Sequence, residues 1–301
     1  MNRLDAMQAF VRVAELGGFT RAAESLGLPK ASVSTAVQQL EAALGARLLH
    51  RTTRRVEMTQ DGRMFYERSR DLLADMDELQ AMFQQGGPSL RGRLRVDMPS
   101  GTARRFVVPR LAEFLDAHPQ LELELSSTDR RVDLVREGFD CVLRVGTLGD
   151  SSLIARPLGR MRIATCASPE YLRRFGTPRS LEDLAGHRLI HYVGSFGSKP
   201  LGFEYWDGEA YREWPMAGAL TVNNSDAYEA ACIAGLGLVQ VPLVGVEDRI
   251  REGLLVEVLP QLRAEPMPVT LLYANRRHLP KRVQAFMHWV AEVMAPQLER
   301  V

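Results

Sequence analysis

Residues 20–58 read TRAAESLGLPKASVSTAVQQLEAALGARLLHRTTRRVEM. Within this stretch Ala23, Gly27 and Val33 stand at relative positions 0, 4 and 10. A helix-turn-helix needs a small residue where its two helices touch, a turn residue that tolerates positive φ, and an apolar anchor beneath its second helix. The three residues meet these three needs, so the stretch predicts a helix-turn-helix that binds DNA.

The surrounding residues divide into three short helices. Apolar residues recur at helical spacing over 4–14, which predicts a first helix. We expect Thr20 to cap a second helix over 21–26, and a third helix to run over 30–44 until Gly45 ends it. Beyond it, apolar residues bracket the polar segment His50–Arg55, which predicts two short strands joined by a basic turn, or wing.

The outward face of the third helix and the wing carry the residues expected to contact DNA. Short polar side chains suit hydrogen bonds to base edges and phosphates in the major groove, and the N-terminal half of a recognition helix enters that groove. A solvated surface position is the alternative for each residue. The predicted DNA-binding residues are Lys30, Ser32, Ser34, Thr35, Gln38, Arg51, Arg54 and Arg55.

A long helix is predicted to start at Thr59 and to continue to the glycines at 86 and 87. Its seam residues advance by alternating steps of 4 and 3, as in a coiled coil, with one polar break. They are Phe65, Ser69, Leu72, Met76, Leu79 and Phe83. We expect this seam to pair with a second copy of the chain; packing against its own domain is the alternative.

Residues 86–93, GGPSLRGR, have the composition of a hinge, and the pattern beyond them alternates strands with helices. A βαβαβ order over about 94–145 predicts a mostly parallel sheet, and a second α/β set follows from about 156. The fold class is therefore α+β multidomain, with a ligand cleft between two lobes. The expected domains are 1–58, 59–87 and 88–301, the last with lobe 1 over about 92–160 and 268–301 and lobe 2 over about 161–267.

Polar residues follow several strands of this C-terminal domain. Ser100-Gly101-Thr102 and Asn223-Asn224-Ser225 each open a helix, and two helix N-termini at one cleft would suit an anion or a polar small molecule. Simple capping is the alternative, and Asp226 leaves the charge of the effector open. The predicted effector-binding residues are Ser100, Thr102, Thr147, Ser195 and Asn224, with no metal and no cofactor.

The formal net charge of the 301 residues is only +1, but the charge is unevenly distributed. Residues 28–58 carry five basic and two acidic side chains, whereas 59–88 carry three basic and six acidic ones. A basic DNA-reading segment is therefore offset by an acidic helix. The small total does not exclude a nucleic-acid partner.

Other classes of protein fit the sequence less well. The three cysteines, at 141, 166 and 232, form no C-x-x-C pair and are expected to be small buried side chains. Gly194–Ser198 is no G-x-S-x-G motif, and His187 and His191 lack a helix and a following Glu, so an enzyme is not expected. The N-terminus has no continuous apolar segment, which predicts a soluble, cytoplasmic protein and argues against a secreted receptor.

Residues 9–62, AFVRVAELGGFTRAAESLGLPKASVSTAVQQLEAALGARLLHRTTRRVEMTQDG, resemble the LysR-type transcriptional regulators. The segments DSSLIARPLG, LEDLAGHRLIHY and AGLGLVQVP, at 150–159, 181–192 and 234–242, resemble the effector domain of that family. Many members carry Arg where this chain has Thr35, which leaves a base contact by Thr35 open.

The resemblance implies a winged helix-turn-helix, a linker helix that dimerises, and a two-lobed periplasmic-binding-protein-like domain. It places Ser100 and Thr102 at the first-strand effector position and Asn224 near the second-lobe one. The implied partners are a double-stranded DNA operator, a small-molecule co-inducer and further copies of the chain in a dimer or homotetramer. RNA polymerase is an additional candidate partner.

Overall fold

The computed structural model describes residues 2–51, 56–81, 90–149, 152–274 and 279–299. These residues form two compact units. The first unit comprises Met1–Arg93 with His118–Glu122, and the second comprises Leu94–Ala117 with Leu123–Val301.

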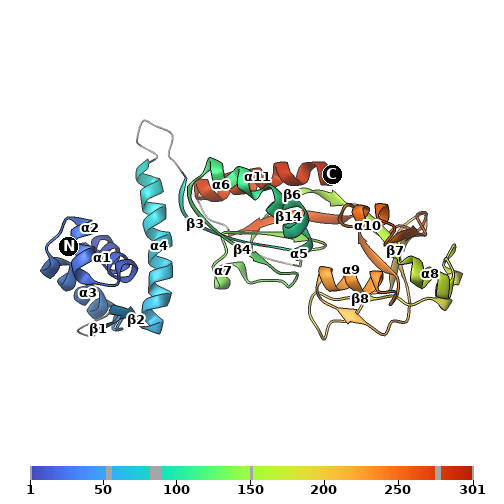
Figure 1. Cartoon of the computed structure of the whole chain (residues 1–301), viewed down its shortest axis with the longest axis horizontal. Helices are drawn as coiled ribbons and strands as arrows, with labels where there is room; N and C mark the ends of the chain where they lie inside the picture. Colours follow the sequence, from blue (N-terminus) through green and yellow to red (C-terminus); the bar gives the residue numbers. More distant parts are fainter. Residues whose placement is uncertain (1, 52–55, 82–89, 150–151, 275–278, 300–301) are drawn as a thin grey trace. The chain divides into compact units, whose positions relative to one another are not determined.

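The first unit has the element order expected of a winged helix-turn-helix (Figure 1). Its elements are α1 (Arg3–Leu16), α2 (Phe19–Leu26), α3 (Lys30–Leu44), β1 (Leu49–Arg51), β2 (Val56–Met58) and α4 (Gln60–Ala81). Strands β1 and β2 pair antiparallel, which confirms the two strands of the wing. Thr20 was expected to cap a helix that starts at residue 21, and this expectation is wrong, because α2 begins two residues earlier, at Phe19, with Gly18 as its N-cap.

The core of the first unit confirms the three residues that define the helix-turn-helix. Ala23 and Val33 are buried, and Gly27 adopts the left-handed conformation, with a φ of 65°. The N–H of Gly27 closes α2 on the carbonyls of Ala23 and Glu24. Ala23 and Val33 belong to one buried core cluster, which also contains Phe10.

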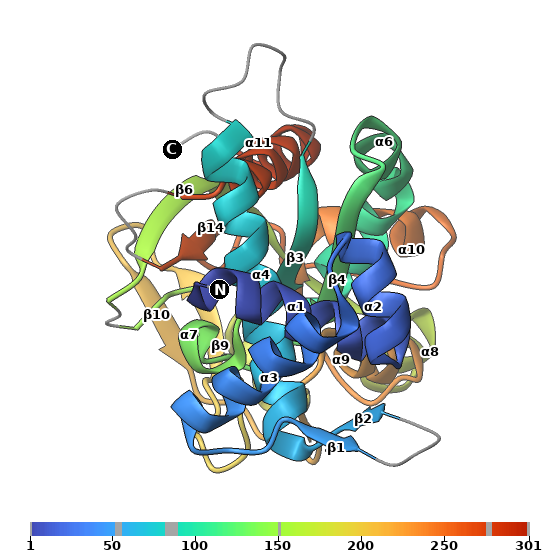
Figure 2. The same ribbon diagram turned by 90° about the vertical axis from the view of Figure 1, so that its left-hand side faces the viewer.

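Helix α4 starts close against the base of the wing (Figure 2). The Thr59 hydroxyl accepts a hydrogen bond from the N–H of Gly62 at 2.8 Å and donates to the carbonyl of Arg47 at 2.7 Å. A Cβ at Gly62 would lie 1.9 Å from the carbonyl oxygen of Leu48. Only glycine allows this approach of α4 to the chain before β1.

Only some of the predicted seam residues of α4 are exposed and available to a second copy of the chain. Phe65 packs edge-on against Phe10, with ring centroids 5.6 Å apart, and Ser69 is fully buried by the chain itself. The expectation of a continuous intermolecular seam is therefore wrong at these two positions: Phe65 packs on the core of the first unit, and Ser69 is buried within the chain. Leu72 keeps 49% of its surface exposed. The side chain of Leu79 and all of Phe83 lie outside the described residues.

The first lobe of the second unit is built on a five-stranded sheet of order β4-β3-β5-β14-β6 (Figure 1). The strands are β3 (Arg91–Met98), β4 (Gln120–Ser127), β5 (Cys141–Val145), β6 (Ile154–Met161) and β14 (Met267–Tyr273), with the helices α7 (Leu134–Glu137) and α11 (Lys281–Met294). Strand β3 runs parallel to β5, but β14 is antiparallel to both β5 and β6. The expectation of a mostly parallel sheet fails at β14 because the chain returns to this lobe from the second one.

The second lobe carries three smaller sheets, of order β12-β7-β13, β11-β8 and β10-β9. Its strands are β7 (Ile163–Ala167), β8 (His191–Tyr192), β9 (Phe203–Trp206), β10 (Tyr211–Trp214), β11 (Thr221–Val222), β12 (Val239–Pro242) and β13 (Val256–Val258). Its helices are α8 (Pro169–Phe175), α9 (Ser225–Ile233) and α10 (Glu247–Arg251). The sequence did not predict the β9–β10 hairpin or β13.

A distorted helical segment follows β3, at the place of the first helix of the expected βαβαβ order. It comprises α5 (Ser100–Thr102), a π-helical turn over Ala103–Val107, a 3₁₀ turn over Val108–Arg110 and α6 (Leu111–Ala117). A π-helical turn admits one extra residue and commonly marks a functional site. Here it carries Arg104 and Arg105.

The three cysteines are free and buried, as expected. Burial raises the pKa of the Cys166 thiol to about 12. Across the described ranges, no helix is both long enough and apolar enough to span a membrane.

Candidate functional site

Helix α3 has one buried and one exposed face. Val33, Ala36, Val37 and Leu40 are buried in the core of the first unit. Of the predicted DNA-binding residues, Lys30, Thr35 and Gln38 are exposed, and Ser32 and Ser34 are half-buried. The helix therefore presents a polar face made of short side chains.

The start of α3 is open. It follows Pro29, and in the part of the chain that the structure describes no side chain caps its first turn. The backbone of Val33 closes the first turn on the carbonyl of Pro29. The N–H groups of Lys30, Ala31 and Ser32 precede that bond, and such groups at a helix start attract an anion such as a phosphate.

The wing is fixed to α3 by Glu41. Its carboxylate accepts hydrogen bonds from the N–H groups of Leu48 at 2.8 Å and Leu49 at 3.1 Å. Arg51 is the last residue of β1. Arg54 and Arg55 lie outside the described residues, as does the side chain of Arg51.

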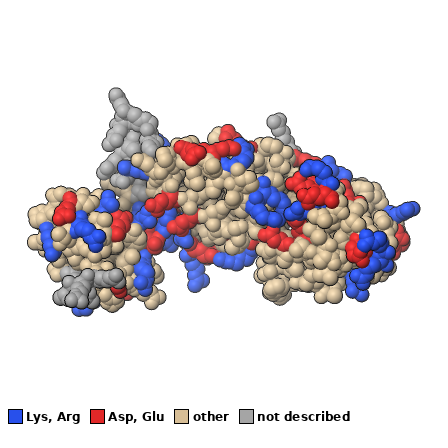
Figure 3. Space-filling model, viewed as in Figure 1, with Lys and Arg blue, Asp and Glu red and all other residues tan. Residues whose placement is uncertain are grey.

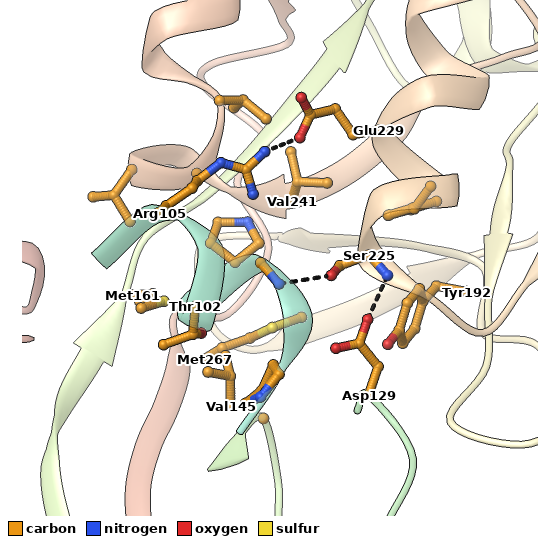
Figure 4. A pocket seen from close by; sticks show the side chains of 18 of the residues that line it. Thr102, Arg105, Asp129, Val145, Met161, Tyr192, Ser225, Glu229, Val241 and Met267 are labelled. Atoms are coloured by element: carbon orange, nitrogen blue, oxygen red, sulfur yellow. Dashed lines mark hydrogen bonds and ion pairs between the residues drawn. The ribbon is translucent and has the colours of Figure 1, made fainter. Parts of the chain in front are cut away.

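The second unit contains a cavity of about 340 Å³ between its two lobes (Figure 4). Residues of α5, the π-helical turn and β5 form one side, and residues of α9 and β12 form the other. The wall is largely apolar. Its apolar side chains include Phe106, Val145, Met161, Val241, Val246 and Met267.

Only one of the predicted effector-binding residues lies in the wall of this cavity, and it is Thr102. Ser100 lies at the rim, where its hydroxyl is 2.9 Å from that of Ser225. Asn224 caps α9 by accepting from the N–H groups of Asp226 and Ala227. Thr147 and Ser195 are exposed and do not line the cavity.

Asp129, which the sequence analysis did not single out, bridges the two lobes. Its carboxylate accepts from the N–H of Ser100 at 2.9 Å and from the N–H of Ser225 at 2.5 Å (Figure 4). The Ser100 hydroxyl lies 3.3 and 3.2 Å from its two oxygens. Asp129 follows shortly after the end of β4, and an acidic residue at the end of a strand was the only sequence signal for it.

A second set of contacts crosses the cleft from the π-helical turn. Arg105 pairs with the buried carboxylate of Glu229 on α9 (Figure 4), and Arg104 pairs with Asp226 at 2.9 Å. Arg249 of α10 also binds Glu229, at 2.9 Å. The two lobes are thus also joined by pairs of opposite charge.

A buried ion pair lies beneath the cavity. Arg144 of β5 donates to Asp97 of β3 at 2.6 Å, and Asp97 is 0% exposed. The Thr128 hydroxyl donates to the same carboxylate at 3.1 Å. On the visible surface, Lys and Arg side chains lie in groups beside groups of Asp and Glu, and much of the surface between them carries neither (Figure 3).

Two tyrosines complete the polar part of the wall. The rings of Tyr192 and Tyr228 lie 5.5 Å apart, and the Tyr228 hydroxyl accepts from the N–H of Gln240 at 3.1 Å. Burial raises the pKa of both hydroxyls, and the nearby Asp129 carboxylate adds to the rise at Tyr192. Both groups are therefore neutral at physiological pH.

A winged helix-turn-helix joined to a two-lobed ligand-binding domain defines a transcriptional regulator that senses a small molecule. Two family models match the chain. Residues 4–63 match the model described as "Bacterial regulatory helix-turn-helix protein, lysR family", and residues 87–295 match "LysR substrate binding domain". The chain belongs to the LysR family. It is a DNA-binding transcriptional regulator with an effector-binding domain, and not an enzyme.

Relatives resemble the chain over its whole length. It is 48% identical to the HTH-type transcriptional regulator YhjC of Escherichia coli (strain K12), covering 99% of this chain and 100% of the relative. It is 40% identical to the HTH-type transcriptional repressor PA14_22550 of Pseudomonas aeruginosa (strain UCBPP-PA14), covering 99% and 94%. The solved structure of CrgA, a LysR-type regulator of Neisseria meningitidis, has a TM-score of 0.60 at 30% identity and covers 96% and 97%.

Proposed function

We propose that this regulator reads its operator with α3 in the major groove and the wing at the flanking backbone. The residues assigned to the DNA are Lys30, Ser32, Ser34, Thr35, Gln38, Arg51, Arg54 and Arg55. The observation that carries the assignment is the division of α3 into a buried apolar face and an exposed face with Lys30, Thr35 and Gln38. The uncapped first turn adds backbone N–H groups for a phosphate.

The second part of the proposal concerns the effector. A small-molecule co-inducer binds in the cavity between the lobes and shifts their closure, and this shift changes how the DNA-binding units engage the operator. Thr102 lies in the cavity wall, whereas Ser100 and Asn224 act at its rim through their contacts with Ser225 and the start of α9. The coupling can be no larger than the difference in effector affinity between the two states.

Assembly is the third part. LysR-type regulators oligomerise, and we assign this chain to a dimer or a homotetramer that acts in the cytoplasm. The exposed Leu72 and Met64 of α4 support an interface on that helix. Each half of an inverted-repeat operator would then bind one copy of α3. RNA polymerase is the further partner that we propose.

Fluorescence anisotropy of the full chain on its own upstream DNA tests the DNA assignment. The affinity should exceed that for a scrambled duplex and fall steeply with salt, because phosphate contacts release counterions. Gln38→Ala should weaken specific binding by about tenfold, corresponding to a base contact of ~1–3 kcal/mol. The matched control is Gln8→Ala, an exposed residue of α1. Equal loss in both variants, or no preference over scrambled DNA, would contradict the assignment.

A further inference from the structure

We propose that the inter-lobe cavity takes an uncharged, largely apolar small molecule and disfavours carboxylates, because the chain's own Asp129 already occupies the polar end of the cleft. This inference rests on the proposed function, since it names the chemical class of the effector. It follows from three features of the cavity. The N–H donors at its polar end already bind Asp129, its two arginines are in ion pairs, and most of its wall is apolar.

Asp129 uses the hydrogen-bond donors that an anionic ligand would need. Its carboxylate receives the backbone N–H of Ser100 from one lobe and the backbone N–H of Ser225 from the other. The Ser100 hydroxyl adds a third donor. A carboxylate ligand at this place would have to displace Asp129 or lie beside its negative charge.

The basic side chains of the cavity wall are already in ion pairs. Arg105 and Arg144 are the two basic side chains among the described residues that line the cavity. Arg144 binds the fully buried Asp97, and Arg105 binds Glu229. An anionic ligand would therefore have to break an existing ion pair, and removing the partner of a buried charge is costly.

The remaining wall, whose polar groups include the neutral hydroxyls of Thr102, Tyr192 and Tyr228, suits a neutral molecule. Val145, Met161 and Met267 provide apolar surface at one side. The Thr102 hydroxyl faces the cavity (Figure 4) and has no hydrogen-bond partner among the residues that the structure describes. One hydroxyl or carbonyl group on the ligand could pair with Thr102, which fits a site with few polar groups and a large apolar contact.

Matched neutral and anionic probes test the inference. Isothermal titration calorimetry on the full chain compares 2-naphthamide with 2-naphthoate, and benzamide with benzoate. Each pair has nearly the same shape and differs in charge. The wild-type chain should bind neither carboxylate more tightly than its amide.

Removing Asp129 should reverse this selectivity. Asp129→Ala frees the N–H groups of Ser100 and Ser225, so the affinity for at least one carboxylate should rise by tenfold or more, while the amides change little. Asp129→Asn, which loses the charge but keeps one acceptor oxygen, should give a smaller rise and serves if the alanine variant does not fold. The matched control is Asp116→Ala, an exposed carboxylate on α6, which should behave as the wild-type chain.

The inference is overturned if a carboxylate binds the wild-type chain more tightly than its amide. It is also overturned if the folded Asp129 variants gain no more carboxylate affinity than Asp116→Ala, including the case in which no probe binds any variant. Operator binding measured on the same samples separates the two proposals. If the wild-type chain shows no specific DNA binding, the proposed function is rejected. The probe affinities test the chemical class of the ligand independently of that result.

Discussion

Helices α3 and α9 differ in how the N–H groups of their first turns are satisfied. Among the described residues, no side chain caps the start of α3, which follows Pro29. At the start of α9, three backbone N–H groups have an acceptor. The Asn224 side chain accepts from the N–H groups of Asp226 and Ala227, and Asp129 accepts from that of Ser225. The two helix starts therefore differ in sequence and in structure, since Pro29 precedes α3 and Asn224 precedes α9.

The difference indicates where an external anion can bind. An open helix start offers N–H groups to a phosphate, whereas a start that already holds a carboxylate offers none. In the first unit the polar groups of α3 remain available to DNA. In the second unit the polar groups around the cavity are bound to one another and hold the two lobes together.

The strongest way to break this comparison is to remove one internal partner in the second unit. Asp97→Ala leaves the buried guanidinium of Arg144 without its carboxylate, so it should reduce the free energy of unfolding by about 3–5 kcal/mol. Thermal or urea unfolding of the full chain measures the loss. Arg130→Ala breaks the exposed pair with Glu137 and should cost less than about 1 kcal/mol. Equal losses in the two variants would show that the pair beneath the cavity is not buried in solution.

The junction between the wing and α4 gives the next largest effect. Gly62→Ala places a Cβ against the carbonyl of Leu48, so it should destabilise the first unit by about 1–3 kcal/mol and weaken DNA binding as a consequence. Gly18→Ala is the matched control, because a Cβ there meets nothing within 4 Å and the backbone is extended. Unfolding followed by circular dichroism checks the pair. A stable Gly62→Ala variant would contradict the close approach of α4.

The two helix starts can be compared directly by alanine substitution. Asn224→Ala removes the cap of α9 and should cost about 1 kcal/mol of stability. Ser32→Ala, in the open first turn of α3, should change stability by less than about 0.5 kcal/mol but should weaken operator binding. Unfolding and anisotropy measurements on both variants test the contrast. A larger stability loss for Ser32→Ala would reverse it.

The smallest expected effect concerns His187 of the second lobe. Burial lowers the pKa of this imidazole, and the nearby Asp183 carboxylate only partly opposes the shift. The unfolded chain therefore takes up a proton as the pH falls through about 6.5, while the folded chain resists it. Stability should decline between pH 7.5 and 5.5, and His187→Gln should make the decline shallower. Melting temperatures across that range measure this; an unchanged slope would remove His187 from the account.

The first unit was predictable from sequence because its signals are local. Gly27 and Gly45 end helices by their own conformational freedom, and the spacing of Val33 and Val37 fixes the buried face of α3. The N-cap of α2 was misplaced by two residues, at Thr20 instead of Gly18. The seam of α4 was misjudged at Phe65, since a periodic apolar pattern does not say which surface covers it.

The cavity was harder to predict because its wall joins segments far apart in the chain. Asp129 and Ser225 are 96 residues apart, and Arg105 and Glu229 are 124 apart. No spacing rule brings such pairs together before the fold is known. The polar residues at the helix starts could be recognised in the sequence. That Asp129 accepts hydrogen bonds from the N–H groups of Ser100 and Ser225 could not.

Hydrogen–deuterium exchange of the full chain, with and without its upstream DNA at low salt, tests the central claim most directly. The account predicts that DNA slows exchange in residues 28–40, above all in the first turn of α3, and leaves the already closed start of α9 unchanged. Unaltered exchange over 28–40 while the DNA is bound would contradict the claim that the open, polar face of α3 reads the operator.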